Sequence, residues 1–514
     1  MAGNKQISNN EKTYDHVLKY TGLFGGVQGL TMLMGVARNK LVALLIGPAG
    51  LGFINMYNSV AGLIHQSTNL GLGFSAVKHI SELSDTGDDK AASDYVKTVR
   101  TWCFITAFLG MLLCCLLSHQ ISYWSFNSYA YTVKFCLLSP VIAMMAITAG
   151  ELAIMKGLKQ LKKVAMTSVC GAFATLLICI PVYSLWGMKG IVLSLVLCNA
   201  SVLMVTLFFS CQIVPWQIDL RSAAVLANGL PMVRLGIGYI IAGVLGQGAE
   251  YVIRTMIQEY SDIAHVGLYN SGYIMAVSYA SMVFVAIEAD FFPRLSAACK
   301  NVESANRIIN QQIEICVLLI SPVLIGFVIS MPYLVRVLYS MEFHPAVPMA
   351  ISAAMFMFFR ALTLPAAYLA LARGDSRMFM LTELVYDVFI ALAVPFAFRH
   401  YGLMGAGWAI SIGGFIYLLL IHILYHFKYG YVFSSKILNV YVLQFLLLSF
   451  VIAVFLYLKG SIAEYFGVGD NVVKWVVGIS SFALSVYVSL KVLKRETSLI
   501  ADLKARFTNK LGRK

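Results

Sequence analysis

The feature that most constrains the fold is an internal repeat: motifs of residues 20–210 return near residues 235–425. One offset of 214 to 217 residues fits every match, whereas chance matches would scatter. A period of this length is far too long for a solenoid and is typical of transporters built from two similar halves. The matched pairs are Gly52 with Gly267, Gly157 with Gly374, Pro181 with Pro395, and Gly187 with Gly402.

The apolar content identifies the surroundings of these halves. Hydrophobic residues make up 59% of the chain and charged residues 12%, with a mean hydropathy of +0.79, so a bilayer must cover the apolar surface. Continuous apolar runs that can cross a core of ~30 Å predict about fourteen helices and argue against a β-barrel. The predicted spans are 19–46, 52–77, 101–119, 130–155, 164–184, 189–211, 232–256, 266–291, 308–331, 345–372, 378–398, 404–427, 437–458 and 473–493.

The predicted fold class is an all-α polytopic membrane protein with about fourteen transmembrane helices, in two six-helix lobes related by a parallel repeat, plus a C-terminal helix pair. Because each lobe has an even number of spans, both enter the membrane in the same sense and leave a cleft between two similar bundles. The predicted segments are a cytoplasmic N-terminal segment 1–18, an N-lobe 19–211, a cytoplasmic linker 212–231, a C-lobe 232–427, the extra pair 437–493 and a basic tail 494–514.

The distribution of cations predicts the orientation. Most lysines and arginines fall in the loops on the side shared by both termini, which the positive-inside rule makes cytoplasmic. The net charge of +14 follows from this topology and gives no reason to invoke nucleic acid. The opening residues 1–10 are polar and lack the apolar core of a cleavable signal. Ten cysteines without C-x-x-C spacing predict neither a metal site nor a disulfide framework.

Four cations at membrane depth are candidates for binding an anionic substrate: Arg38, Lys40, Arg254 and Arg360. Each costs ~3 kcal/mol at a helix centre unless it is paired or hydrated. Arg254 follows Arg38 by 216 residues, so each lobe offers a cation at a similar depth, which would suit a diphosphate. Arg38 and Lys40 lie about 200° apart on a helix, so only one can face the cleft.

Other interpretations of these cations remain open. Arg38 and Lys40 could extend to the interface, and Arg254 could pair with Glu250 one turn earlier. Arg360 lies deepest in its span, and Lys134 lies near a helix start and is expected at the interface.

Lys78 and Arg294, which close the second helix of each lobe, could attract a lipid phosphate at the cytoplasmic entrance, although topology alone would also place cations there.

Acidic side chains and one histidine at membrane depth are candidates for coupling transport to H⁺ or Na⁺. Glu383 and Asp387 lie four residues apart on one helical face, where they either serve a proton-coupled site or neutralise a buried cation such as Arg360. His65 could shuttle protons or be a hydrogen-bonded polar residue. The candidates for coupling are Glu151, Glu250, Glu288, Asp290, Glu383, Asp387 and His65.

Residues 39–52 read N-K-L-V-A-L-L-I-G-P-A-G-L-G, and residues 69–73 with Lys78 continue the motif. This stretch resembles the N-terminal signature of Wzx-type oligosaccharide flippases of the multidrug/oligosaccharidyl-lipid/polysaccharide exporter superfamily, in the branch that moves O-antigen and enterobacterial common antigen units. The resemblance implies a bilobal helical fold in the bacterial inner membrane, with a central cationic cavity that opens to each side in turn. Lys40 matches the lysine of the signature. Many members of this branch have about twelve spans, whereas fourteen are counted here, as in the related lipid II flippases.

The favoured function is a flippase that moves a glycan on undecaprenyl diphosphate from the cytoplasmic to the periplasmic leaflet, with coupling to a proton or sodium gradient left open. No cofactor and no catalytic residue are expected. Partners are the lipid-linked oligosaccharide, membrane lipids and, as further candidates, a polysaccharide polymerase and a chain-length regulator. One alternative is a multidrug cation exporter, whose cavity should be dominated by acids. Another is a membrane-embedded polymerase or glycosyltransferase, which usually needs a sizeable extramembrane loop that this sequence lacks.

Overall fold

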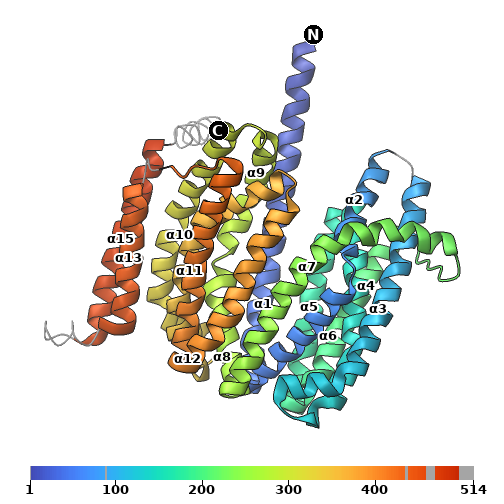
Figure 1. Ribbon diagram of the computed structural model, residues 1–514, viewed down its shortest axis with the longest axis horizontal. Coiled ribbons are helices and arrows are strands. Elements are labelled where there is room, and N and C mark those ends of the chain that lie inside the picture. The colour runs from blue at the N-terminus through green and yellow to red at the C-terminus, as the bar shows by residue number, and fades with distance from the viewer. Residues whose placement is uncertain (1, 87–88, 435–437, 459–468, 497–514) are drawn as a thin grey trace, which may run out of the picture. The chain divides into compact units, whose positions relative to one another are not determined.

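The computed structural model describes residues 2–86, 89–434, 438–458 and 469–496. Its secondary structure in these residues is helical, with no strand in the described part (Figure 1). Nine helices among the described residues are long and apolar enough to cross a membrane. The chain is therefore an all-α multi-pass membrane protein, as predicted. The number of fourteen spans stays a prediction, because some of the nine contain two helices joined by a tight turn.

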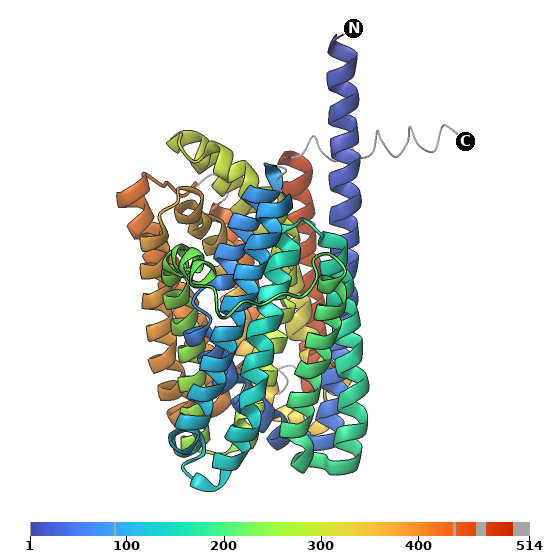
Figure 2. The same ribbon diagram turned by 90° about the vertical axis from the view of Figure 1, so that its right-hand side faces the viewer.

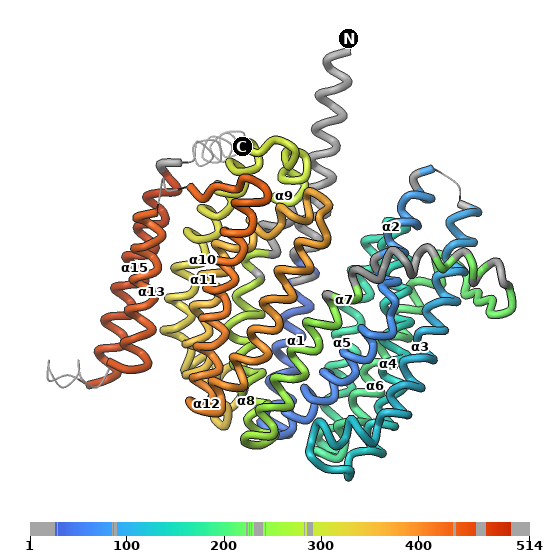
Figure 3. Tube along the Cα trace, in the orientation of Figure 1, coloured from blue at the N-terminus to red at the C-terminus, as the bar shows by residue number. Residues whose placement is uncertain are grey.

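The chain divides into two compact units. The first unit comprises Met1–Gly267 with Val337–Glu342, and the second comprises Leu268–Arg336 with Phe343–Lys514. Figure 3 traces the described helices of both units and draws the remaining residues in grey. The boundaries of the predicted lobes stay a prediction.

In the first unit, α3 to α6 run side by side, as Figures 1 and 2 both show. A buried apolar cluster joins α2, α3 and α4, with Ile80, Val99 and Ile154 at most 1% exposed. The elements are α1 (Ala2–Thr68), α2 (Leu72–Asp85), α3 (Asp89–Phe126), η1 (Tyr129–Tyr131), α4 (Thr132–Gly157), α5 (Leu161–Trp186), η2 (Gly187–Gly190), α6 (Ile191–Cys211) and α7 (Ala223–Tyr260).

Two breaks interrupt the α1 and α2 region. At Gly47 the backbone leaves the helix with a φ of 63°, one residue after the predicted first span ends. The predicted second span, 52–77, is wrong as a continuous helix, because α1 ends at Thr68 and α2 begins at Leu72. Leu70 and Gly71 lie between them in the left-handed conformation, with φ of 53° and 64°, which ends one helix and starts another.

The remaining elements are α8 (Ile263–Tyr273), the π-helical η3 (Ile274–Tyr279), α9 (Met282–Ala298), α10 (Val302–Leu338), η4 (Met341–Ala346), α11 (Val347–Ala372), α12 (Ser376–Tyr429), α13 (Leu438–Ala453), the π-helical η5 (Val454–Leu458) and α15 (Asp470–Glu496). The predicted C-terminal helix pair is confirmed, since Gln444 of α13 forms hydrogen bonds with Ser485 and Ser489 of α15. The predicted span over 266–291 contains the π-helical segment, a common irregularity at functional places in helices.

The long helix α12 is a hairpin that turns at Gly402, where φ is 61°. Its two halves lie side by side, since Tyr417 donates to Glu383 over 2.6 Å and Tyr429 donates to Asp375 over 2.8 Å. The predicted spans 378–398 and 404–427 are thus both present. Gly187 makes the corresponding turn between α5 and α6 with a φ of 51°, as the repeat predicts.

The repeat is visible in backbone hydrogen bonds. Where α4 ends, Lys159 lies in the left-handed conformation with a φ of 57°, and where α11 ends, Gly374 does so with a φ of 72°. The offset between these two residues is 215, so the sequence match of Gly157 with Gly374 is wrong by two residues. The bonds that correspond are Leu158 to Ile154 with Arg373 to Leu369, Lys159 to Lys156 with Gly374 to Leu371, and Gln160 to Met155 with Asp375 to Ala370.

Candidate functional site

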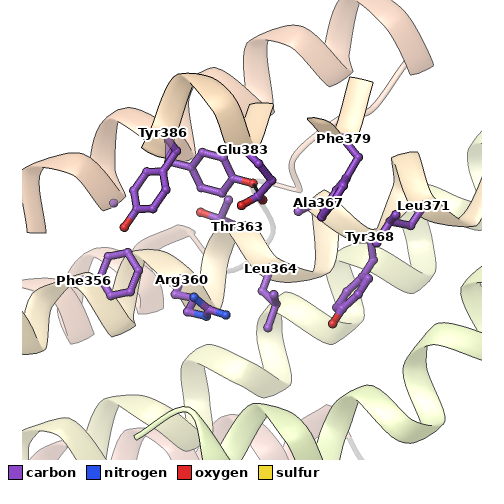
Figure 4. A pocket seen from close by; sticks show the side chains of 12 residues that line it. Phe356, Arg360, Thr363, Leu364, Ala367, Tyr368, Leu371, Phe379, Glu383 and Tyr386 are labelled. Atoms are coloured by element: carbon purple, nitrogen blue, oxygen red, sulfur yellow. Dashed lines mark hydrogen bonds between the residues drawn. The ribbon is translucent and has the colours of Figure 1, made fainter. Parts of the chain in front are cut away.

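A cavity of about 330 Å³ lies in the second unit between α11 and the two halves of α12 (Figure 4). Figure 4 shows Arg360 and Tyr368 projecting from one helix, and Glu383 and Tyr386 from the helix that faces it. The lining residues are Phe356, Arg360, Thr363, Leu364, Ala367, Tyr368, Leu371, Phe379, Glu383, Tyr386, Gly414 and Tyr417.

Helical spacing brings these side chains together. The lining residues of α11 recur every three or four positions from Phe356 to Leu371, which places them on one face of the helix. Phe379, Glu383 and Tyr386 follow the same spacing on the first half of α12. Gly414, on the second half, allows a close approach, since a Cβ atom there would lie 2.6 Å from the ring of Phe356. Three apolar helical faces thus enclose a space that contains charged groups.

Arg360 supplies the positive charge of this cavity. Its Nε atom is buried and has no hydrogen-bond partner among the described residues. The guanidinium carbon lies 6.0 Å from the centre of the Phe356 ring, a weak cation–π distance. A cation at membrane depth costs ~3 kcal/mol unless it is paired or hydrated. The cavity therefore offers a cation whose hydrogen bonds the protein leaves for another group to complete.

Glu383 supplies the negative charge. It accepts the hydrogen bond from Tyr417, whose ring centre lies 5.0 Å from that of Tyr386. In the described part of the chain, Glu383 and Arg360 line the same cavity without forming an ion pair. Neutralisation of Arg360 by Glu383, one of the alternatives from the sequence, is thus not what the contacts of Glu383 show. Asp387 is half-buried one turn further along α12.

Arg254 of α7 is held by the protein. Its side chain is 12% exposed, pairs with the Glu250 carboxylate over 3.0 Å and donates to the Ser59 hydroxyl. The i,i+4 partner expected from the sequence is confirmed. Arg254 therefore differs from Arg360, because a substrate would have to compete with Glu250 for its guanidinium.

Lys40 and Arg38 face different surroundings on α1. Lys40 donates through Nζ to the backbone carbonyl of Tyr339. Arg38 is half-buried and lies near the thiols of Cys179 and Cys198, on α5 and α6. The expectation that only one of the two could face a given cleft is consistent with these contacts.

The other predicted residues are spread over several helices. Lys78 is exposed on α2, and Arg294 is exposed on α9. His65 of α1 is half-buried, with an Nδ1 atom that has no hydrogen-bond partner among the residues described. The side chains of Glu288 and Asp290 lie outside the described part of the chain. Within that part, no three His, Cys, Asp or Glu side chains come together as a metal ion would need.

The most buried charged pair was missed by the sequence reasoning. Arg100 and Glu151 have side chains that are 1% and 2% exposed, and they form two hydrogen bonds of 2.8 and 3.0 Å. Ser210 of α6 also donates to the Glu151 carboxylate. Arg100 was assigned to the charged loop 78–100, although its position at the start of an apolar run was the available signal. Glu151, a candidate for ion coupling, is thus engaged as the counter-ion of a buried arginine.

The same arginine fastens the segment between α6 and α7. Arg100 donates to the carbonyl of Pro215 over 2.6 Å and to that of Val214 over 3.2 Å. One turn away on α3, Lys97 pairs with Asp219 over 2.9 Å. These contacts attach the segment to α3.

Comparisons with known proteins agree with this architecture. A family model described as polysaccharide biosynthesis protein matches residues 41–348. No curated protein matches the chain.

Solved structures share the fold at low identity. An inward-facing multidrug resistance MATE transporter of the MOP superfamily is 15% identical over 78% of this chain and 94% of its own, with a TM-score of 0.64. The lipid II flippase MurJ, in an inward closed conformation, is 14% identical over 92% of this chain and 99% of its own, also with a TM-score of 0.64. A transporter of the same superfamily from Pyrococcus furiosus is 13% identical over 80% and 95%, with a TM-score of 0.57.

Proposed function

Because the chain belongs to the family of polysaccharide biosynthesis proteins, we propose that it is a flippase for an undecaprenyl-diphosphate-linked oligosaccharide. It moves this glycolipid from the cytoplasmic to the periplasmic leaflet by alternating access. It lies in the bacterial inner membrane with both termini in the cytoplasm, and it delivers the glycan to a polysaccharide polymerase and its chain-length regulator. The fold that it shares with transporters, MurJ among them, supports this proposal.

The observation that carries the proposal is the position of Arg360. A guanidinium with an unpartnered Nε in a lined cavity suits a phosphate, since its planar fork can hold two oxygens at once. A volume of about 330 Å³ is at the small end for ligand sites, so the cavity fits the diphosphate and an adjoining sugar while the polyprenyl tail stays in the bilayer. The rings of Tyr368, Tyr386 and Tyr417 offer apolar surface and hydroxyl groups to that sugar.

Coupling to an ion gradient is assigned to Glu383 in this proposal. Its carboxylate shares the cavity with Arg360 and is bound by Tyr417, so a proton or sodium ion arriving there would alter the field that a diphosphate experiences.

The same residue supports the second candidate, a multidrug cation exporter. A cationic drug would bind at Glu383 and would be repelled by Arg360. The two candidates therefore predict opposite effects when Arg360 is neutralised.

The test uses proteoliposomes loaded with undecaprenyl-diphosphate oligosaccharide, with an imposed proton or sodium gradient. Exposure of the glycan to an impermeant glycosidase is the readout. We expect protein-dependent exposure that Arg360→Ala abolishes and Arg360→Lys retains in part, because the lysine keeps the charge and loses the fork. Arg377→Ala, which removes an exposed arginine from the first turn of α12, is the matched control and should flip normally. Arg254→Ala should impair transport while membrane insertion stays intact.

Two outcomes would contradict the proposal. One is normal flipping by Arg360→Ala and Arg254→Ala, which would remove the cationic site. The other is protein that exposes no glycan and instead moves an organic cation faster once Arg360 is neutralised, which would assign it to drug export.

A further inference from the structure

A second cavity, of about 630 Å³, lies in the first unit between α1, α4 and the start of α6. Its walls are apolar and aromatic, with Phe53, Tyr57, Leu137 and Leu193 among the lining residues. The Phe53 ring lies 5.7 Å from that of Tyr131, so this wall continues into a group of packed rings. Neither the repeat nor the proposed transport site accounts for this cavity.

Two lysines line the cavity, Lys134 and Lys189. Both side chains are exposed, and in the described part of the chain neither forms a hydrogen bond or an ion pair. The Lys134 ammonium lies 4.6 Å from the centre of the Tyr131 ring, which leaves its charge available. None of the described residues that line the cavity is acidic. Two positive charges therefore border an apolar space without a protein counter-ion.

The connections between helices place both lysines at one end of the unit. Lys134 lies in the first turn of α4, directly after the α3–α4 connection, and Lys189 lies in η2, which joins α5 to α6. Exposed aromatic side chains, Trp124, Tyr129 and Trp186, flank the same two connections. Tryptophan and tyrosine gather where a membrane protein crosses the interface between hydrocarbon and water. The cavity therefore opens at the depth of the lipid phosphates.

We propose that this cavity binds one anionic phospholipid. Its phosphate lies between Lys134 and Lys189, and one acyl chain lies along Phe53, Leu137 and Leu193. Charge complementarity and the apolar wall together favour a whole lipid over a soluble anion, because a free phosphate would leave most of the wall exposed. This inference does not depend on the proposed transport activity.

The test is native mass spectrometry of the purified protein with phosphatidylglycerol and with phosphatidylcholine of matched acyl chains. We expect one phosphatidylglycerol to be retained at least tenfold more tightly than phosphatidylcholine. Lys134→Ala and Lys189→Ala should each weaken its binding about fivefold, and the double variant about thirtyfold. Lys156→Ala is the matched control, since Lys156 is exposed at the other end of α4 and borders neither cavity.

Two further arms separate the possible sources of the phosphate group. Leu137→Trp fills part of the apolar wall while keeping both lysines, and it should weaken phosphatidylglycerol binding as well. Inorganic phosphate at millimolar concentration should not displace the lipid. Thermal unfolding of every variant identifies one that has lost its fold, in which case Lys134→Gln with Lys189→Gln replaces the alanine pair.

Several results would overturn the proposal. These are equal binding of phosphatidylglycerol and phosphatidylcholine, undiminished binding by the folded double variant, or displacement by inorganic phosphate. A polyprenyl diphosphate that displaces phosphatidylglycerol at a tenfold lower concentration would make the cavity a substrate site instead.

Discussion

Gly52 and Gly267 contact each other's helices through the backbone in a reciprocal way. A Cβ atom on Gly52 would lie 1.9 Å from the carbonyl oxygen of Ile263, and one on Gly267 would lie 2.0 Å from that of Pro48. Gly267 follows Gly52, and Ile263 follows Pro48, by the same 215 residues. The two copies of the repeat therefore meet here around a local twofold axis, and each provides the glycine that lets the other approach.

This contact predicts that Gly52→Ala and Gly267→Ala are both strongly destabilising. The added methyl group meets backbone atoms, which no side-chain rotation can move away, so the loss should be about 3 kcal/mol or more. Thermal unfolding of the purified variants in detergent measures it. Gly35→Ala is the control, because no atom lies within 4 Å of a Cβ there. Equal unfolding temperatures for Gly52→Ala and Gly35→Ala would show that the helices do not cross at these glycines.

The equivalent turns at Lys159 and Gly374 predict substitutions of opposite sign. Both residues have a positive φ, which costs a residue with a side chain ~1–2 kcal/mol. Lys159→Gly should therefore stabilise the protein by about 0.5–1 kcal/mol, after the greater freedom of glycine in the unfolded chain is counted. Gly374→Ala should destabilise it by about 1–2 kcal/mol, although a Cβ there meets no atom within 4 Å.

Unfolding temperatures measure both changes. Lys159→Ala is the control that removes the lysine side chain and keeps the strain. If Lys159→Gly is no more stable than Lys159→Ala, the turn does not have the left-handed conformation.

The buried pair of Arg100 and Glu151 predicts a stability effect that is separate from ion coupling. Glu151→Gln leaves the Arg100 charge buried without its counter-ion and should destabilise the protein by about 3–5 kcal/mol. The molecules that fold should keep the gradient dependence of transport. Urea titration and flipping under an imposed gradient give the two readouts. The reverse result, unchanged stability with lost gradient dependence, would make Glu151 the coupling carboxylate.

The Asp375 carboxylate predicts a pH dependence of stability. Hydrogen bonds from Lys428 and Tyr429 lower its pKa to about 2, from the usual value near 3.9. A carboxylate with a lowered pKa stabilises the folded state above its unfolded pKa, and this contribution is lost as pH falls through the folded value. Unfolding temperatures should therefore fall more between pH 5 and pH 2 for the native protein than for Asp375→Asn.

Lys428→Gln should reduce the same pH response, because it removes the bond of 2.6 Å that is the main cause of the shift. Asp94→Asn, at an exposed position of α3, serves as the control and should leave the response unchanged. An identical pH profile for Asp375→Asn and the native protein would show that the Lys428 bond is absent in solution.

The sequence predicted those parts of the fold that depend on local properties. Apolar runs and turn glycines such as Gly187 and Gly402 located the helices and the repeat, because hydropathy and left-handed conformations act over a few residues. The break at Leu70 escaped this reasoning, since its apolar side chain kept the hydropathy high through a turn that leucine seldom adopts.

The candidate site was predicted less completely, because the direction of a charged side chain depends on tertiary packing. Arg360 and Arg254 look alike in sequence, yet one lies in a cavity without an ion pair and the other is held by Glu250. Arg100 and Glu151 are 51 residues apart, and no local pattern connects them. The structural offset of 215 also places Arg254 one residue away from a match with Arg38, about 100° around a helix.

The α12 hairpin is joined at its open end by Asp375 and Lys428, near its middle by Glu383 and Tyr417, and at its turn by the chain itself. A hairpin joined at three levels moves as one body, so Glu383 and Tyr417 keep their spacing. Arg360 belongs to α11, which meets the hairpin at the turn before Asp375. The separation of the positive and negative groups is therefore a single mechanical variable, a rotation about that turn. Opening the cavity and uncovering its charge to a ligand are one movement.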